Sequence, residues 1–191
     1  MRFNLILMVL IIAAPFSFFG QGKSADLTYY EDQSQVRPMS FEYTNAQNVV
    51  HKKWGIIYKS SEGVDTSQVK VSNSKFEEAL SQRHGEGWNG KLMGAVKMEL
   101  SAQSRIRLMI EKLAEYKLMD TTQLYIEVLP KGKKYICKVI GQQVQGDKKP
   151  FVIFRKAVYS IKREKLKLKS SKARPIDVAY LSEAYHLGLV K

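Results

Sequence analysis

Cysteine is almost absent from this chain, since Cys137 is the single one among 191 residues. No internal disulfide can therefore form, and packing alone must stabilise the fold. Cys137 alternates with Tyr135 and Val139, which would share one face of a strand with it. We interpret the thiol as a small buried core residue.

Recognisable catalytic and metal-binding motifs are also missing. The histidines, His51, His84 and His186, lie far apart without metal-ligand spacing. The chain has no G-x-S-x-G motif and no glycine-rich phosphate loop after a strand. We therefore predict no catalytic residue, no metal and no cofactor. A minority hypothesis is a hydrolase of unknown type in which His84 and Glu86 act as an acid–base pair on a turn.

The hydrophobic run at the start is too short to span a bilayer. Leu5 to Phe19 is an uncharged stretch of 15 residues, interrupted by Pro15, whereas a spanning helix needs roughly 20. Arg2 precedes the run, and small or polar residues follow it, as in a secretory signal. We predict that residues 1–22 are a signal peptide, or alternatively an uncleaved membrane anchor, and that the protein is periplasmic or secreted.

Acidic residues are scarce relative to basic ones. The chain has 31 Lys and Arg against 18 Asp and Glu, for a net charge of +13. The 44 residues from Lys131 to Arg174 contain 15 Lys or Arg and only 2 acids, so this segment carries the whole excess. Charge that is segregated in this way produces an electrostatic field with a direction.

The expected organisation is a loose polar lead-in over 23–40 and a single α+β domain over 41–191. The first half contains helical patterns, at 41–53, 75–83 and 95–117, with a short strand at 54–58 and a glycine-rich turn at 84–90. The longest helix has apolar residues at intervals of three and four, which we expect to face the core: Met98, Ala102, Ile106, Met109, Ile110, Leu113 and Tyr116.

The second half changes to a period of two, which predicts strands. Segments 123–130 and 134–141 read as a hairpin, followed by strands at 150–161 and 164–169. Pro175 suits the first turn of a short closing helix. Helices followed by an antiparallel meander define an α+β fold, with a basic β region over 121–174.

The sequence KLKLK places Lys165, Lys167 and Lys169 on one strand face, with leucines on the other. One interpretation is an edge strand that its lysines protect from pairing with other chains. The other is a docking surface, because further basic residues lie at neighbouring turns and would gather if consecutive strands pair. The candidate binding residues are Lys131, Lys133, Lys134, Lys162, Arg163, Lys165, Lys167 and Lys169.

An anionic partner is the natural complement of such a surface. The candidates are an acidic lipid membrane, lipopolysaccharide or an acidic glycan. Nucleic acid is less favoured because export is expected and lysine outnumbers arginine, the better reader of bases. We therefore predict an exported, non-enzymatic binding or structural module of the cell envelope. The alternative is an assembly protein or inhibitor that binds an acidic protein.

Two segments carry a resemblance to a known group of proteins. VVHKKWGIIY (Val49 to Tyr58) and LSQRHGEGWNGKL (Leu80 to Leu92) resemble segments of small exported proteins of Bacteroidetes, which have an E-K-K-Y-G-type segment and a later K-Y-G-x-x-W segment. The resemblance implies localisation in the envelope. It implies no activity and no functional residue.

Overall fold

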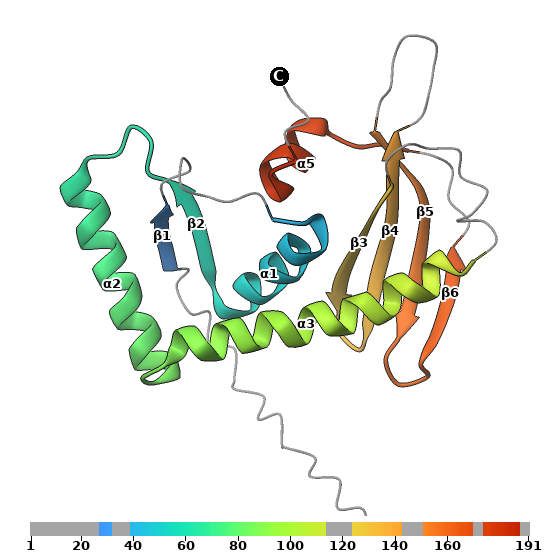
Figure 1. Cartoon of the computed structure of the whole chain (residues 1–191), viewed down its shortest axis with the longest axis horizontal. Helices are drawn as coiled ribbons and strands as arrows, with labels where there is room; N and C mark the ends of the chain where they lie inside the picture. Colours follow the sequence, from blue (N-terminus) through green and yellow to red (C-terminus); the bar gives the residue numbers. More distant parts are fainter. Residues whose placement is uncertain (1–26, 32–38, 114–123, 143–150, 170–173, 188–191) are drawn as a thin grey trace, which may run out of the picture.

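The computed structural model describes residues 27–31, 39–113, 124–142, 151–169 and 174–187. The predicted signal segment over 1–22 lies outside this part of the chain. Helices dominate the first half, an antiparallel sheet forms the second half, and a short helix closes the chain (Figure 1). The predicted α+β fold is therefore confirmed. In the described part of the chain, no helix combines the length and the apolar character needed to cross a membrane.

The described residues of the first half form three helices and a small parallel sheet. The helices are α1 (Phe41–Trp54), α2 (Thr66–His84) and α3 (Trp88–Glu111). Strand β1 (Leu27–Glu31) pairs in parallel with β2 (Ile56–Ser60). Strand β1 lies inside the segment expected to be a loose lead-in. The sequence pattern did not reveal it because its partner is distant along the chain.

The predicted boundaries hold for α1 and fail for α2. Ser40 caps α1 by accepting a hydrogen bond from the backbone of Tyr43, and Gly55 ends the helix in the left-handed conformation. α2 begins nine residues before the predicted start at Lys75. The reason is Asp65, whose carboxylate accepts hydrogen bonds from the next backbone N–H groups and caps a helix there.

Helix α3 differs from the prediction in its start and in its buried face. It begins at Trp88, inside the predicted turn, after Gly87 in the left-handed conformation. Met98 and Met109, which were assigned to the core, are 70% and 37% exposed. Ile106 and Ile110 are buried as predicted, together with Leu92 and Val96. The buried face also includes the polar residues Glu99, Gln103 and Arg107, which the apolar pattern did not place in the core.

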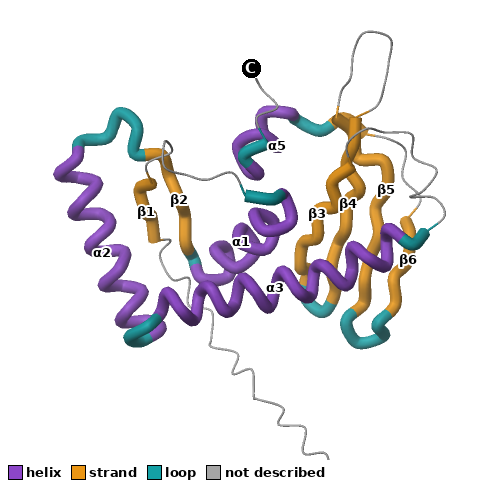
Figure 2. The backbone as a smooth tube through the Cα atoms, viewed as in Figure 1, coloured by secondary structure: helices purple, strands orange, loops and turns teal. Residues whose placement is uncertain are grey.

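The main sheet has the strand order β3-β4-β5-β6, with all neighbours antiparallel (Figure 2). The strands are β3 (Leu124–Lys131), β4 (Lys134–Gln142), β5 (Phe151–Ser160) and β6 (Lys165–Lys169). The short β7 (Arg174–Pro175) also pairs with β5, so Pro175 does not begin the closing helix as predicted. That helix, α5 (Val178–Tyr185), starts after the capping residue Asp177.

The two faces of the sheet have different coverings. Helix α3 packs on one face, where Ile106 and Ile110 contact a cluster that includes the fully buried Cys137. The assignment of Cys137 to the core is therefore confirmed. Helix α5 covers one end of the other face, where Leu181 and Tyr185 pack with Ile140. The rest of that second face has no helix over it in the described structure (Figure 1).

A buried polar junction joins α1, α3 and β3. Arg107 of α3 donates hydrogen bonds to Asn45 Oδ1 of α1 at 2.8 Å and to the carbonyl of Ile126 in β3 at 3.1 Å. The backbone N–H of Val128 donates to the same Asn45 oxygen at 2.8 Å. A third acceptor for Arg107 is Gln103 Oε1, at 2.9 Å. These bonds fix the position of the sheet relative to both helices.

Replacement of Asn45 tests this junction. Asn45→Ala removes the acceptor shared by Arg107 and Val128, and leaves a buried cation and a buried N–H without that partner. We expect the free energy of unfolding to fall by about 2–4 kcal/mol. Urea unfolding measures the change. Asn48→Ala, at an exposed position of the same helix, is the matched control, with an expected loss below about 1 kcal/mol. Equal losses in the two variants would show that the junction has no special role.

Candidate functional site

The strand register gathers lysines on one face of the main sheet. Directly opposed residues of antiparallel strands share a face. One row across the four strands consists of Lys131, Lys134, Ser160 and Lys165. The next row consists of Leu129, Ile136, Val158 and Lys167. The third row consists of Glu127, Lys138, Lys156 and Lys169. We call this surface the lysine face, with seven lysines: Lys131, Lys134, Lys138, Lys156, Lys165, Lys167 and Lys169.

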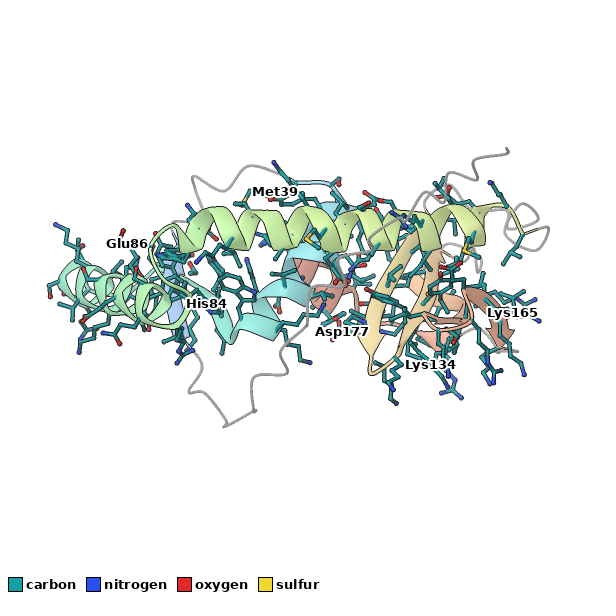
Figure 3. All side chains as sticks on the ribbon, turned by 90° about the horizontal axis from the view of Figure 1, so that it is seen from below. Met39, His84, Glu86, Lys134, Lys165 and Asp177 are labelled. Atoms are coloured by element: carbon teal, nitrogen blue, oxygen red, sulfur yellow. The ribbon has the colours of Figure 1, made fainter. Side chains whose placement is uncertain are left out.

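The lysine face is the side of the sheet that α3 does not cover. The residues that alternate with its lysines, such as Cys137 and Leu168, pack with the α3 core. Figure 3 shows the side chains of Lys134 and Lys165 on the side of the sheet opposite α3, pointing away from it. The hydrophobic contacts of α3 therefore determine which face remains available to a partner.

The charges of this face are close together and mostly uncompensated. Neighbouring strands lie about 4.8 Å apart and alternate residues of one strand about 6.8 Å apart, which is less than the screening length of about 8 Å at physiological salt. Among the seven lysines of this face, only Lys138 forms an ion pair with a described residue, the buried Glu127. Lys156 lies directly opposite Lys169, and Lys131 opposite Lys134. Such like-charged pairs are destabilising.

Two turns extend the basic surface at one end of the sheet. The backbone N–H of Ile161, after β5, donates a hydrogen bond to the carbonyl of Lys133, in the β3–β4 turn, at 3.4 Å. The turns therefore lie side by side. They add the exposed cations Lys133, Lys162 and Arg163. Ile161 itself is 49% exposed, so an aliphatic side chain stands among these cations.

The structure brings all the predicted binding residues to this one region. Five of them lie on the lysine face, and Lys133, Lys162 and Arg163 lie in the adjoining turns. The candidate binding residues did not include Lys138 and Lys156, although Lys156 was expected to lie near the other basic residues. Successive residues of a strand point to opposite faces, so the prediction that Cys137 points into the core could also have placed Lys138 on the outer face. Lys156 required the register between β4 and β5, which a β-bulge between Val139 and Ile140 disturbs.

Edge protection explains only part of this arrangement. Strand β6 lies at the edge of the sheet, so the lysines of KLKLK are in a position to protect that edge. Strands β4 and β5, however, each have a neighbour on both sides. Lys134, Lys138 and Lys156 lie on these inner strands, where no free edge needs protection. The inner lysines therefore favour the docking interpretation.

The acid–base pair of the minority hypothesis is not assembled in the described structure. The ring of His84 stacks on Trp54 with centroids 3.9 Å apart. Burial, and then the charges of Arg83 and Lys91, lower the pKa of His84. No hydrogen bond or ion pair between described residues joins His84 to Glu86, which lies exposed in the turn. The hydrolase hypothesis gains no support from this geometry.

Comparisons with protein-family models, curated proteins and solved structures find no match to this chain. No family is therefore shown, and the resemblance to exported Bacteroidetes proteins stays a prediction. The function of the protein is consequently inferred from the lysine face, its adjoining turns and the predicted signal segment.

Proposed function

We propose that this protein is a non-enzymatic binding module that docks the lysine face onto an anionic lipid membrane of the cell envelope. The single observation that carries the proposal is the presence of lysines on the inner strands β4 and β5 as well as on the edge strand β6. Lysines directly opposite each other lower the stability of a sheet. An anionic partner would neutralise these lysines and remove the repulsion. Solubility alone does not require lysines to lie opposite each other, so binding explains the arrangement better.

The apolar residues of the surface favour a membrane over a soluble polyanion. Ile161 stands exposed at the end of the sheet beside Lys162 and Arg163. Half-buried Leu129 and Val158 lie between the two outer rows of the lysine face. A lipid surface offers both phosphates for the cations and a boundary where an aliphatic side chain leaves water. An acidic glycan offers anionic groups for the cations but no such boundary for an aliphatic side chain.

The rival function is binding of an acidic protein. It uses the same cations, and the apolar middle row of the face would suit a protein surface. Lipopolysaccharide shares the phosphate and acyl chemistry of an anionic lipid and is a second source of the same ligand groups. Binding to soluble polyglutamate distinguishes an acidic protein partner from an anionic lipid.

Vesicle binding tests the proposal. A variant with Lys165→Gln, Lys167→Gln and Lys169→Gln should lose about 3 kcal/mol of binding to mixed phosphatidylglycerol and phosphatidylcholine vesicles, at about 1 kcal/mol for each lysine. This loss is about two orders of magnitude in the partition coefficient. Sedimentation of vesicles with bound protein measures it. The melting temperature should hardly change, because these lysines are exposed.

A control variant separates the lysine face from net charge. Lys70→Gln, Lys75→Gln and Lys97→Gln remove the same charge from exposed helical positions and should leave binding nearly unchanged. Ile161→Ser should weaken vesicle binding about tenfold and leave binding to soluble polyglutamate unaltered. Equal losses in the two lysine variants, or preferential binding to polyglutamate, would contradict membrane docking through this face.

We extend the proposal to export, which the signal-like pattern of residues 1–22 supports. We expect the protein in envelope fractions to lack these residues, and mass spectrometry of its N-terminal peptide measures this. Recovery of Met1 in the membrane fraction would indicate the uncleaved anchor instead. A protein that keeps Met1 and is found only in the cytoplasm would contradict export.

A further inference from the structure

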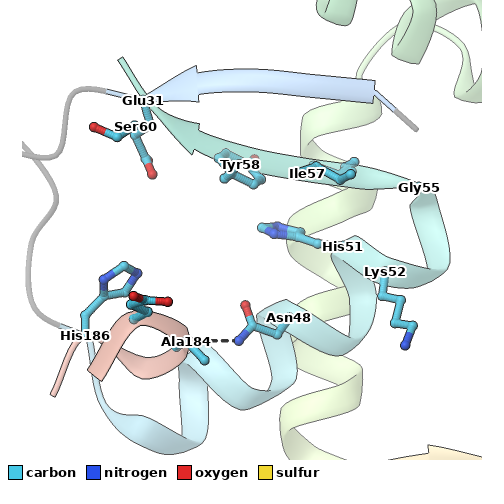
Figure 4. Close-up of a pocket in the computed structure, with 12 residues that line it drawn as sticks. Glu31, Asn48, His51, Lys52, Gly55, Ile57, Tyr58, Ser60, Ala184 and His186 are labelled. Carbon is cyan, nitrogen blue, oxygen red and sulfur yellow. Dashed lines mark hydrogen bonds between the residues drawn. The ribbon is translucent and has the colours of Figure 1, made fainter. Parts of the chain in front are cut away.

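A pocket of about 960 Å³ lies between β2, α1 and α5 (Figure 4). It shares no residue with the lysine face. Its volume is in the range of small-molecule sites. It is lined by Glu31, Asn48, His51, Lys52, Gly55, Ile56, Ile57, Tyr58, Ser60, Glu183, Ala184 and His186.

His51 presents an unpaired, neutral imidazole to this pocket. The residue is only 9% exposed, and its ring stacks on Tyr58 with centroids 4.6 Å apart. Figure 4 shows the ring projecting from α1 into the space below β2. Burial lowers the pKa of His51 to about 4, so the ring is neutral at pH 7 and one nitrogen is a hydrogen-bond acceptor. No hydrogen bond between described residues occupies that nitrogen.

The neighbouring polar groups are also mainly acceptors. Asn48 Nδ2 donates to the carbonyl of Ala184 at 3.0 Å, which fixes the amide and leaves its oxygen directed into the pocket (Figure 4). Glu31 and Glu183 line the pocket, and neither forms an ion pair with another described residue. The side chain of Lys52 points away from the centre in Figure 4.

An aromatic ring completes the site beside these acceptors. Burial, and next the charge of Glu31, raise the pKa of Tyr58 to about 12, so the phenol stays protonated. Tyr29 pairs with Tyr58 and Glu31 with Ser60 in the register of β1 and β2, so Glu31 lies on the same face of the small sheet as Tyr58, two residues further along. A carboxylate next to an aromatic ring is a favourable environment for an organic cation.

We infer that this pocket binds a small organic cation with a primary amine, held by the carboxylates of Glu31 and Glu183 and by the acceptor atoms of Asn48 and His51. An ammonium group has three donors and no acceptor, which complements this lining. A metal ion does not fit, because no group of three His, Cys, Asp or Glu in the described residues is arranged to hold one. This inference is independent of the lysine face.

A matched pair of probes tests the inference. The diamine 1,5-diaminopentane and the diol 1,5-pentanediol have the same chain length and differ in their end groups. Titration of the ¹⁵N-labelled protein should give saturable shifts with the diamine at Glu31, His51 and Tyr58, and no saturable shifts there with the diol. Saturation by both probes would show that hydroxyl groups suffice and would overturn the requirement for an amine.

Isosteric variants locate the binding site. Glu31→Gln with Glu183→Gln should weaken diamine binding by about tenfold to a hundredfold, because charge-assisted hydrogen bonds are lost. Glu62→Gln with Glu86→Gln removes two exposed carboxylates outside the pocket and should leave the affinity unchanged. Absence of saturable diamine binding, or equal weakening in both double variants, would overturn the inference.

Discussion

The hydrogen bonds that Asn45 accepts from Arg107 and from the backbone of Val128 are the constraint on which the arrangement of this protein depends. Asn45 Oδ1 is fully buried and accepts from α3 and β3 at the same time. Helices α1 and α3 are thereby both tied to β3, the first strand of the main sheet. The junction is not optimal for stability, since Asn45 Nδ2 and Arg107 NH1 lack hydrogen-bond partners in the described structure. Hydrogen bonds are directional, so the junction specifies an orientation that apolar contacts alone would leave less defined.

This orientation gives the sheet two unlike faces. With α3 held against one face, the alternation of each strand turns the lysines of β4, β5 and β6 toward the other. Helix α5 then covers one end of the lysine-bearing side, where Tyr185 donates a hydrogen bond to Glu127 at 2.7 Å. Burial, and then the charge of Glu127, raise the pKa of Tyr185 far above its usual value, so the phenol remains a donor. The buried carboxylate also pairs with Lys138, and no other lysine of the face forms an ion pair with a described residue.

Local patterns in the sequence predicted much of this fold. The period of two identified β3 to β6, and the spacing of apolar residues over 41–53 identified α1. Failures occurred where the decisive contact is distant or polar. Strand β1 depends on a parallel partner, and Glu99, Gln103 and Arg107 are buried because they pair with one another and with other elements. Charge segregation indicated the lysine region. The pocket beside His51 was not predictable, because its walls come from four separate elements, β1, α1, β2 and α5.

The central claim is that the lysine face contacts an anionic membrane as one continuous surface. Lysine acetylation followed by mass spectrometry tests this claim directly when the free protein is compared with the protein on phosphatidylglycerol-containing vesicles. The account predicts that vesicles protect Lys131, Lys134, Lys165, Lys167 and Lys169 together, while Lys70, Lys75 and Lys97 on the helices react as before. Uniform protection of all these lysines, or protection confined to the helical ones, would contradict it.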